Sequence, residues 1–281
     1  MAYKDLAKAA LAFGFHPVLS RMNGGIPIPV LCYHSVNATA NGKCDPIHPE
    51  LFEVHLRYLK AHHTVVPLHA VAQHLATGDV LSPDAVAITF DDGYRDNYEV
   101  AFPLLEKYGV PATIFVVTGF INGEVHLIGD SGWGAMTWKQ VQEMDRGPLI
   151  EIGAHTDTHQ ILSDLTETEA VDEIRRSRNE LQRRLGREID LFAYPNGQGR
   201  DIPPAALTAV RDLGFLGACS TFWRTTQKAS QRFLINRVMI SGGDSADILK
   251  WKISGRFDYI YFVHKIRAMF DSVIRGRGIW K

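Results

Sequence analysis

A short apolar run that ends in two adjacent carboxylates constrains this chain most strongly. Residues Val86–Phe90 are rich in β-branched and aromatic types, which favours a strand buried on both faces. Asp91-Asp92-Gly93 follows at once and is typical of a turn. Functional sites of parallel α/β proteins are built at this end of a strand. Either the turn only joins a strand to a helix that an aspartate caps, or its two acids divide cation binding and proton transfer.

Strand and helix signals alternate along the rest of the chain. Apolar runs near residues 28–35, 112–117, 149–154, 191–194, 215–220 and 234–240 are typical of strands, and helical patterns lie between them, for example over 49–62 and 96–108. Thr166 and Glu169 predict a capping box for a helix that ends before Gly186. The alternation predicts a parallel α/β sheet. Because polar residues directly follow several strands, we expect a barrel with its site at one rim.

Composition excludes several classes of protein. A chain of 281 residues with 46% hydrophobic and 22% charged residues is typical of a soluble globular protein. Its net charge of −1 gives no reason to expect nucleic acid as a partner. Cys32, Cys44 and Cys219 are odd in number and not clustered, which argues against a disulfide framework and against a cysteine-based metal site. No apolar run reaches the ~18 residues that span a bilayer.

Two terminal segments differ from the central part. Asp5 and Lys8 interrupt the start of the chain, which makes it a poor secretion signal, so we expect an amphipathic helix or extension over 1–27. The main domain is expected over 28–255 and an amphipathic helical tail over 256–281. The tail either docks on the barrel or contacts an anionic membrane surface or a partner. We expect a cytoplasmic protein, and the tail would allow peripheral contact with the inner face of the membrane.

His155 and His159 are the first candidates for metal ligands. They lie four residues apart, so on a helical turn they would share a face and grip one cation. A zincin would carry glutamate after the first histidine, but here Thr156 follows it, so the base must come from elsewhere. Asp91-Asp92 supplies both a third ligand and a base. The same ligand set suits non-haem iron oxygenases. Those enzymes typically have all-β scaffolds and ligands close together in sequence, whereas this chain has an α/β pattern and its two aspartates lie far before the first histidine.

Three stretches of the chain together resemble a known family. Thr89–Tyr94, His155–His159 and Phe192–Gly197 are similar in order and spacing to the first three motifs of the polysaccharide deacetylases, the NodB-homology carbohydrate esterases. The resemblance covers roughly residues 28–240. It implies a distorted (β/α) barrel of about seven parallel strands with the active site at the C-terminal rim. It also implies metal-dependent removal of acetyl groups from N-acetylhexosamine residues of a bacterial-type polysaccharide or its precursor.

The resemblance also assigns roles to individual residues. It implies that one divalent ion, with zinc as the expected metal, is held by Asp92, His155 and His159. Asp91 would be the general base, and the backbone N–H of Asn196 would stabilise the oxyanion. The residues expected to contact the N-acetylated glycan or to shape its groove are Tyr33, Tyr194 and Pro195.

The sequence departs from the family pattern at three places. Ala193 stands where many members have an arginine that holds the catalytic base, and Asn196 stands where tyrosine is common. The usual late Leu-x-His motif, whose histidine acts as general acid, is not recognisable, and His264 is the only histidine after His159. We therefore predict that His34, at a strand end on the expected rim, lies near the metal and assists as acid or as a neighbour of the ligands.

These departures keep two other functions open. One is hydrolysis of another amide on the same scaffold, such as deformylation or deacetylation of a lipid-linked sugar, which the basic and apolar tail would suit. The other is a glycan-binding domain that has lost catalysis. The missing arginine and late histidine allow the second alternative, whereas the intact Asp-Asp pair and histidine pair argue against it.

Overall fold

The computed structural model describes residues 25–38, 46–127 and 134–261. The predicted N-terminal helix lies almost entirely outside the described residues, and so does the tail from residue 262, His264 included. The domain boundaries expected from the sequence therefore stay predictions. Within the described ranges, no helix combines the length and the apolar character that crossing a bilayer requires.

Seven parallel strands form one curled sheet in the order β10-β2-β4-β5-β6-β7-β8, and β3 pairs with β4 beside this path. The strands are β2 (Val30–Tyr33), β3 (Thr64–Val65), β4 (Ala85–Phe90), β5 (Ala112–Val116), β6 (Ile150–Ala154), β7 (Leu191–Ala193), β8 (Gly217–Cys219) and β10 (Val238–Met239). A separate antiparallel pair joins β1 (Ile26–Pro27) to β9 (Thr226–Gln227). Ile235, just before β10, pairs with Cys219 of β8, so the two sheet edges approach each other. The predicted distorted barrel is confirmed.

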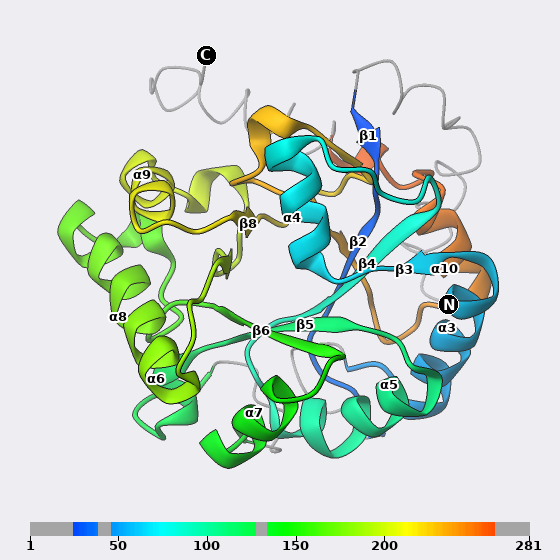
Figure 1. Ribbon diagram of the computed structural model, residues 1–281, viewed down its shortest axis with the longest axis horizontal. Helices are drawn as coiled ribbons and strands as arrows, with labels where there is room; N and C mark the ends of the chain where they lie inside the picture. Colours follow the sequence, from blue (N-terminus) through cyan, green and yellow to red (C-terminus); the bar gives the residue numbers. More distant parts are fainter. Residues whose placement is uncertain (1–24, 39–45, 128–133, 262–281) are drawn as a thin grey trace.

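Helices pack around this sheet, most of them on its outer side. They are α3 (Pro49–His62), α4 (Leu68–Thr77), α5 (Phe102–Tyr108), α6 (Thr118–Ile121), α7 (Trp138–Asp145), α8 (Glu167–Leu185), α9 (Pro204–Asp212) and α10 (Ala246–Ile253). Figure 1 shows α3, α5, α7, α8 and α9 around the periphery. The predicted capping box of α8 is confirmed: the Thr166 and Glu169 side chains each accept a hydrogen bond from the other residue's backbone N–H, and Gly186 ends the helix at φ 69°.

The helix expected over residues 96–108 differs from the prediction. Its first part is a π-helical turn over Asn97–Ala101, in which the Phe102 N–H donates to the Asn97 carbonyl, and α5 begins only after it. Pro103 has no N–H to donate and its ring crowds the carbonyl four residues earlier, so the regular α pattern is interrupted there.

Alternation of side chains across the strands separates two apolar layers. One set of positions packs outward against the helices, including Leu31, Ile88, Ile114, Ile152 and Phe192. The other set faces the barrel interior and packs there with α4, including Val30, Ala87, Phe115, Leu191 and Cys219. Because α4 meets the starts of the strands, the interior is filled from that end, and polar groups remain at the other end.

Candidate functional site

The two adjacent aspartates at the end of β4 face different partners. Asp92 adopts φ 79°, a left-handed conformation that is uncommon for a residue with a side chain, and Gly93 follows at φ 83°. A Cβ at Gly93 would lie 3.0 Å from Val116, so only glycine fits this turn without a shift. Backbone strain of this kind concentrates at functional sites. The turn separates Asp91, at a barrel-interior position, from Asp92, beside the histidines.

His155 and His159 do lie together, but not on a helix as the spacing suggested. His155 directly follows β6, and a loop with left-handed residues at Thr156 (φ 61°) and His159 (φ 60°) brings the second ring back. The ring centroids are 4.9 Å apart. Asp92 Oδ1 lies 3.6 Å from His155 Nε2 and 3.3 Å from His159 Nε2. The three predicted ligands therefore converge.

The chemistry of this donor set fits a cation. His155 Nδ1 lies 2.7 Å from the Ala193 carbonyl, which only accepts, so Nδ1 carries the hydrogen and Nε2 offers a bare lone pair. Burial is the main cause that lowers the pKa of His155 to about 4, so its ring is neutral at pH 7. Asp92 Oδ1 is buried and accepts no hydrogen bond from the described residues. A tetrahedral ion with ligands at ~2 Å separates neighbouring donors by ~3.3 Å, close to the spacings seen here.

Arg237 holds the other aspartate and was not found from the sequence. Its guanidinium donates from Nη1 to Asp91 Oδ1 at 2.6 Å and from Nη2 to Asp91 Oδ2 at 2.7 Å, in a fork that is fully buried. Burial opposes ionisation of Asp91, but the Arg237 charge outweighs it and holds the pKa of this carboxyl well below its usual range. The resemblance implied an arginine at position 193 in contact with this acid, and here Arg237 makes that contact.

His34 directly follows β2, and Asn196 lies three residues after β7. His34 is half-buried, and one of its ring nitrogens lies within 4.8 Å of an Asp91 carboxylate oxygen. Asn196 is exposed at φ 59°, and its side chain donates to Asp201 Oδ2 at 3.0 Å. Among the described residues, none accepts a hydrogen bond from the Asn196 backbone N–H, which leaves that donor available. Pro195 is buried beside it.

Tyr33 and Tyr194 lie elsewhere. Both side chains are only 1% exposed and belong to the layer between the strands and the helices. The Tyr33 hydroxyl lies 3.1 Å from His55 Nδ1, and Tyr194 packs edge-on against Phe192. Strand alternation turns both rings away from the interior. Their burial argues against direct contact with a glycan, so their predicted part in substrate binding finds no support here.

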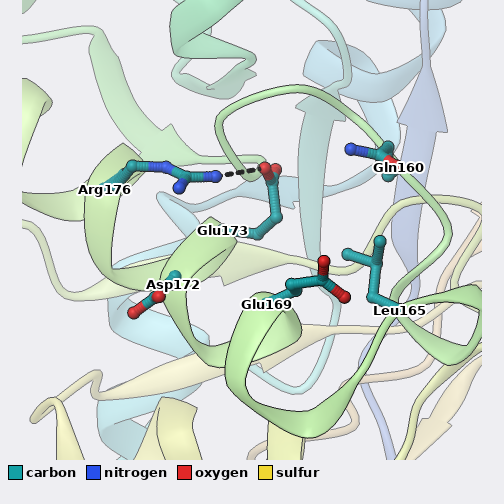
Figure 2. Close-up of a pocket in the computed structure, with 6 residues that line it drawn as sticks. All are labelled: Gln160, Leu165, Glu169, Asp172, Glu173 and Arg176. Carbon is teal, nitrogen blue, oxygen red and sulfur yellow. Dashed lines mark hydrogen bonds and ion pairs between the residues drawn. The ribbon is translucent and has the colours of Figure 1, made fainter.

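Helix α8 supports the loop between the two histidines. The buried Glu173 carboxylate accepts from the backbone N–H groups of Asp157 at 3.1 Å and Thr158 at 2.8 Å. Arg176 donates to both Glu173 and Asp157. Figure 2 shows the hollow on this side of the loop, with the Arg176–Glu173 pair at its wall. Its lining residues are Gln160, Leu165, Glu169, Asp172, Glu173 and Arg176.

Comparisons with known proteins point to one family. A family model described as "Polysaccharide deacetylase" matches residues 79–218. YxkH of Bacillus subtilis (strain 168), which carries the name of a polysaccharide deacetylase, is 30% identical over 78% of this chain and 73% of its own length. The poly-beta-1,6-N-acetyl-D-glucosamine N-deacetylase of Staphylococcus aureus (strain MSSA476) is 26% identical over 71% of this chain and 69% of its own.

Two solved structures share the fold over most of both chains. The Streptococcus pyogenes deacetylase PplD, solved in complex with acetate, superposes with a TM-score of 0.71 at 25% identity and covers 82% of this chain and 99% of its own. IcaB from Ammonifex degensii gives a TM-score of 0.70 at 27% identity over 82% of this chain and 98% of its own.

Proposed function

Because this chain belongs to the polysaccharide deacetylase family and is a hydrolase of amide bonds, we propose that it removes acetyl groups from N-acetylhexosamine residues of a glycan. Enzymes of this family are metal-dependent. We further propose zinc as the ion and Asp92, His155 and His159 as the residues that hold it. The relatives named for poly-β-1,6-N-acetylglucosamine make this polymer the first substrate to test.

The chain's own residues supply the acid–base chemistry. Asp91, kept ionised by Arg237, takes a proton from the attacking water. The Asn196 N–H stabilises the oxyanion that forms when water adds to the acetamide carbon. His34 donates a proton to the nitrogen as the carbon–nitrogen bond breaks, which yields acetate and a free amine. A bound divalent cation would supply Lewis-acid polarisation and a lowered pKa of water.

One observation carries this proposal above the others: a buried carboxylate oxygen without a hydrogen bond lies 3.3 Å and 3.6 Å from two histidine nitrogens. The Asp92 oxygen and the bare Nε2 of His155 would repel each other in a buried place without a cation between them. A purely structural role would not explain why these three side chains lie so close together.

The structure bears differently on the two alternative functions. A silent glycan-binding domain was allowed by the missing arginine at position 193, but Arg237 contacts Asp91 instead. Hydrolysis of an amide on a lipid-linked sugar was suggested by the tail, and residues 262–281 lie outside the described part of the chain. The cytoplasmic location, with or without membrane contact, stays a prediction that cell fractionation would test.

Acetate release from poly-β-1,6-N-acetylglucosamine and from chitooligosaccharides tests the proposal. We expect release that a chelator abolishes and added zinc restores, and we expect none from the Asp91→Asn variant. Release that persists after complete metal removal would contradict the metal-dependent mechanism. Activity confined to lipid extracts would favour the lipid-linked substrate.

A further inference from the structure

We propose that Cys32, His34 and Asp91 form a second, weaker cation site, and that zinc bound there in excess inhibits the enzyme. The binding stands on the geometry of these three residues. The inhibition rests on the function proposed above, because two of the three residues are the acid and the base of that reaction.

The three donor atoms are close enough to share one ion. A cysteine sulfur, a histidine nitrogen and a carboxylate oxygen of these residues all lie within 4.8 Å of one another. Cys32 Sγ lies 3.5 Å from Asp91 Oδ2. Zinc–sulfur and zinc–oxygen distances of ~2.3 and ~2.0 Å at a tetrahedral angle separate the two donors by about 3.5 Å. The sequence concealed this site because Cys32 and Asp91 are 59 residues apart.

The chemistry of the donors selects the kind of ion. Thiolate, imidazole and carboxylate together suit zinc and cobalt rather than magnesium or calcium. The Cys32 thiol now donates its hydrogen to Asp91. When a cation binds, the sulfur–metal bond forms and the thiol proton leaves to water. Cys32 and Asp91 are buried whereas His34 is half-buried, so an ion would enter from the side of His34.

Arg237 makes this site the weaker of the two. Its buried fork already neutralises Asp91. A cation bound by Cys32, His34 and Asp91 would therefore lie close to the positive Arg237 guanidinium, which does not contact the Asp92 cluster. The carboxylate oxygens keep lone pairs outside the fork, which leaves them able to bind a metal. We therefore expect the Asp92 cluster to fill first and the Cys32 cluster only when the metal is in excess.

Cobalt titration of the metal-free full chain tests the site without an activity assay. Thiolate bound to cobalt(II) gives a charge-transfer absorption in the near ultraviolet, which a cluster of two histidines and an aspartate lacks. We expect two cobalt ions per chain at saturation and an absorption band that rises only with the second. The Cys32→Ala variant should bind one ion and show no band, and His34→Ala should also lose the second ion.

A matched variant separates this site from another buried thiol. Cys219→Ala should keep two ions and the band, since this cysteine belongs to neither metal-binding cluster of the described residues. One cobalt ion per wild-type chain at saturation, or a band that persists in Cys32→Ala, would overturn the site.

The inhibition is measured separately. We expect wild-type acetate release to peak near one zinc per chain and to fall at higher zinc. The inhibitory zinc concentration is the one that halves a protein's own maximal rate. This concentration should be at least tenfold higher for Cys32→Ala than for the wild type. Two bound ions without inhibition would contradict the proposed roles of Asp91 and His34 and leave the site itself intact. An unchanged inhibitory concentration in Cys32→Ala would overturn the inhibitory role of this site.

Discussion

At the scale of single residues, Asp91 and Asp92 differ in what they face. Asp91 lies in a bidentate contact with a buried guanidinium, whereas Asp92 offers an oxygen without a hydrogen bond to two histidines. A buried Arg–carboxylate fork fixes both the charge and the direction of the acid. We infer that it keeps one acid available for proton transfer beside a metal ligand.

Replacing Arg237 by lysine tests that inference. Lysine keeps a positive charge but lacks the planar fork, so Asp91 should stay ionised and lose its fixed direction. We expect kcat to fall about 10–100-fold, or ~1.4–2.8 kcal/mol of barrier, with KM and bound metal unchanged. Arg211→Lys, at an exposed arginine that packs on Phe233, is the matched control. Wild-type kcat in Arg237→Lys would exclude a positioning role.

His155 predicts a pH dependence of stability in the metal-free protein. Burial lowers its pKa from 6.5 to about 4, so between these values the unfolded chain binds the extra proton. Stability is therefore lost as pH falls through this window, by roughly 3 kcal/mol at most. Denaturant unfolding at pH 7 and pH 4.5 measures the loss, and comparison with His155→Gln cancels other titrating groups. Equal losses in both proteins would show that His155 is not the source.

The candidate ligands and the candidate base could be predicted from the sequence because each motif is contiguous along the chain. Asp91-Asp92 and the two histidines carry their chemistry in short runs that follow strands. Arg237 could not be predicted, since it lies 146 residues from Asp91. The mostly apolar run that contains it shows no recognisable motif. For Tyr33 and Tyr194, the sequence located the strand ends but not the face of the sheet to which each side chain points, and both rings lie in the layer between strands and helices.

At the scale of elements, helix α8 and the His155–His159 loop act as a unit. Glu173 accepts hydrogen bonds from two loop N–H groups and from the Thr158 hydroxyl. The carboxylate thus takes the place of the backbone carbonyls that would accept from these N–H groups in a helix. The expectation of a helical turn failed because two left-handed residues, Thr156 and His159, lie in this segment. Their cost of about 1–3 kcal/mol each persists only where surrounding contacts enforce it.

Glu173→Gln should weaken metal binding without unfolding the protein. The amide keeps the size of the carboxylate but loses one acceptor and the charge that holds Arg176. We expect zinc affinity to fall about 10–100-fold, as is typical when support of metal ligands is lost. Competition with a chromophoric chelator measures the affinity. Glu180→Gln, on the same helix and paired with Arg183, is the control. Equal zinc affinities in the two variants would contradict this support.

At the scale of the whole molecule, closure of the sheet completes the site. Ile235 pairs with β8 and β10 pairs with β2, so the segment between them spans the gap between the two edges. Arg237 lies in this segment and reaches Asp91 across the interior. Alternation of strands and helices predicted the barrel, because each short signal was local. It could not predict this closure, which depends on pairing between distant and very short strands.

The most direct measurement is the anomalous-scattering map of crystals grown with one zinc per chain. We expect one peak, about 2.0–2.2 Å from Asp92 Oδ1 and from the Nε2 atoms of His155 and His159, with Asp91 still held by Arg237. A peak away from these three atoms, or none at all, would contradict the central claim.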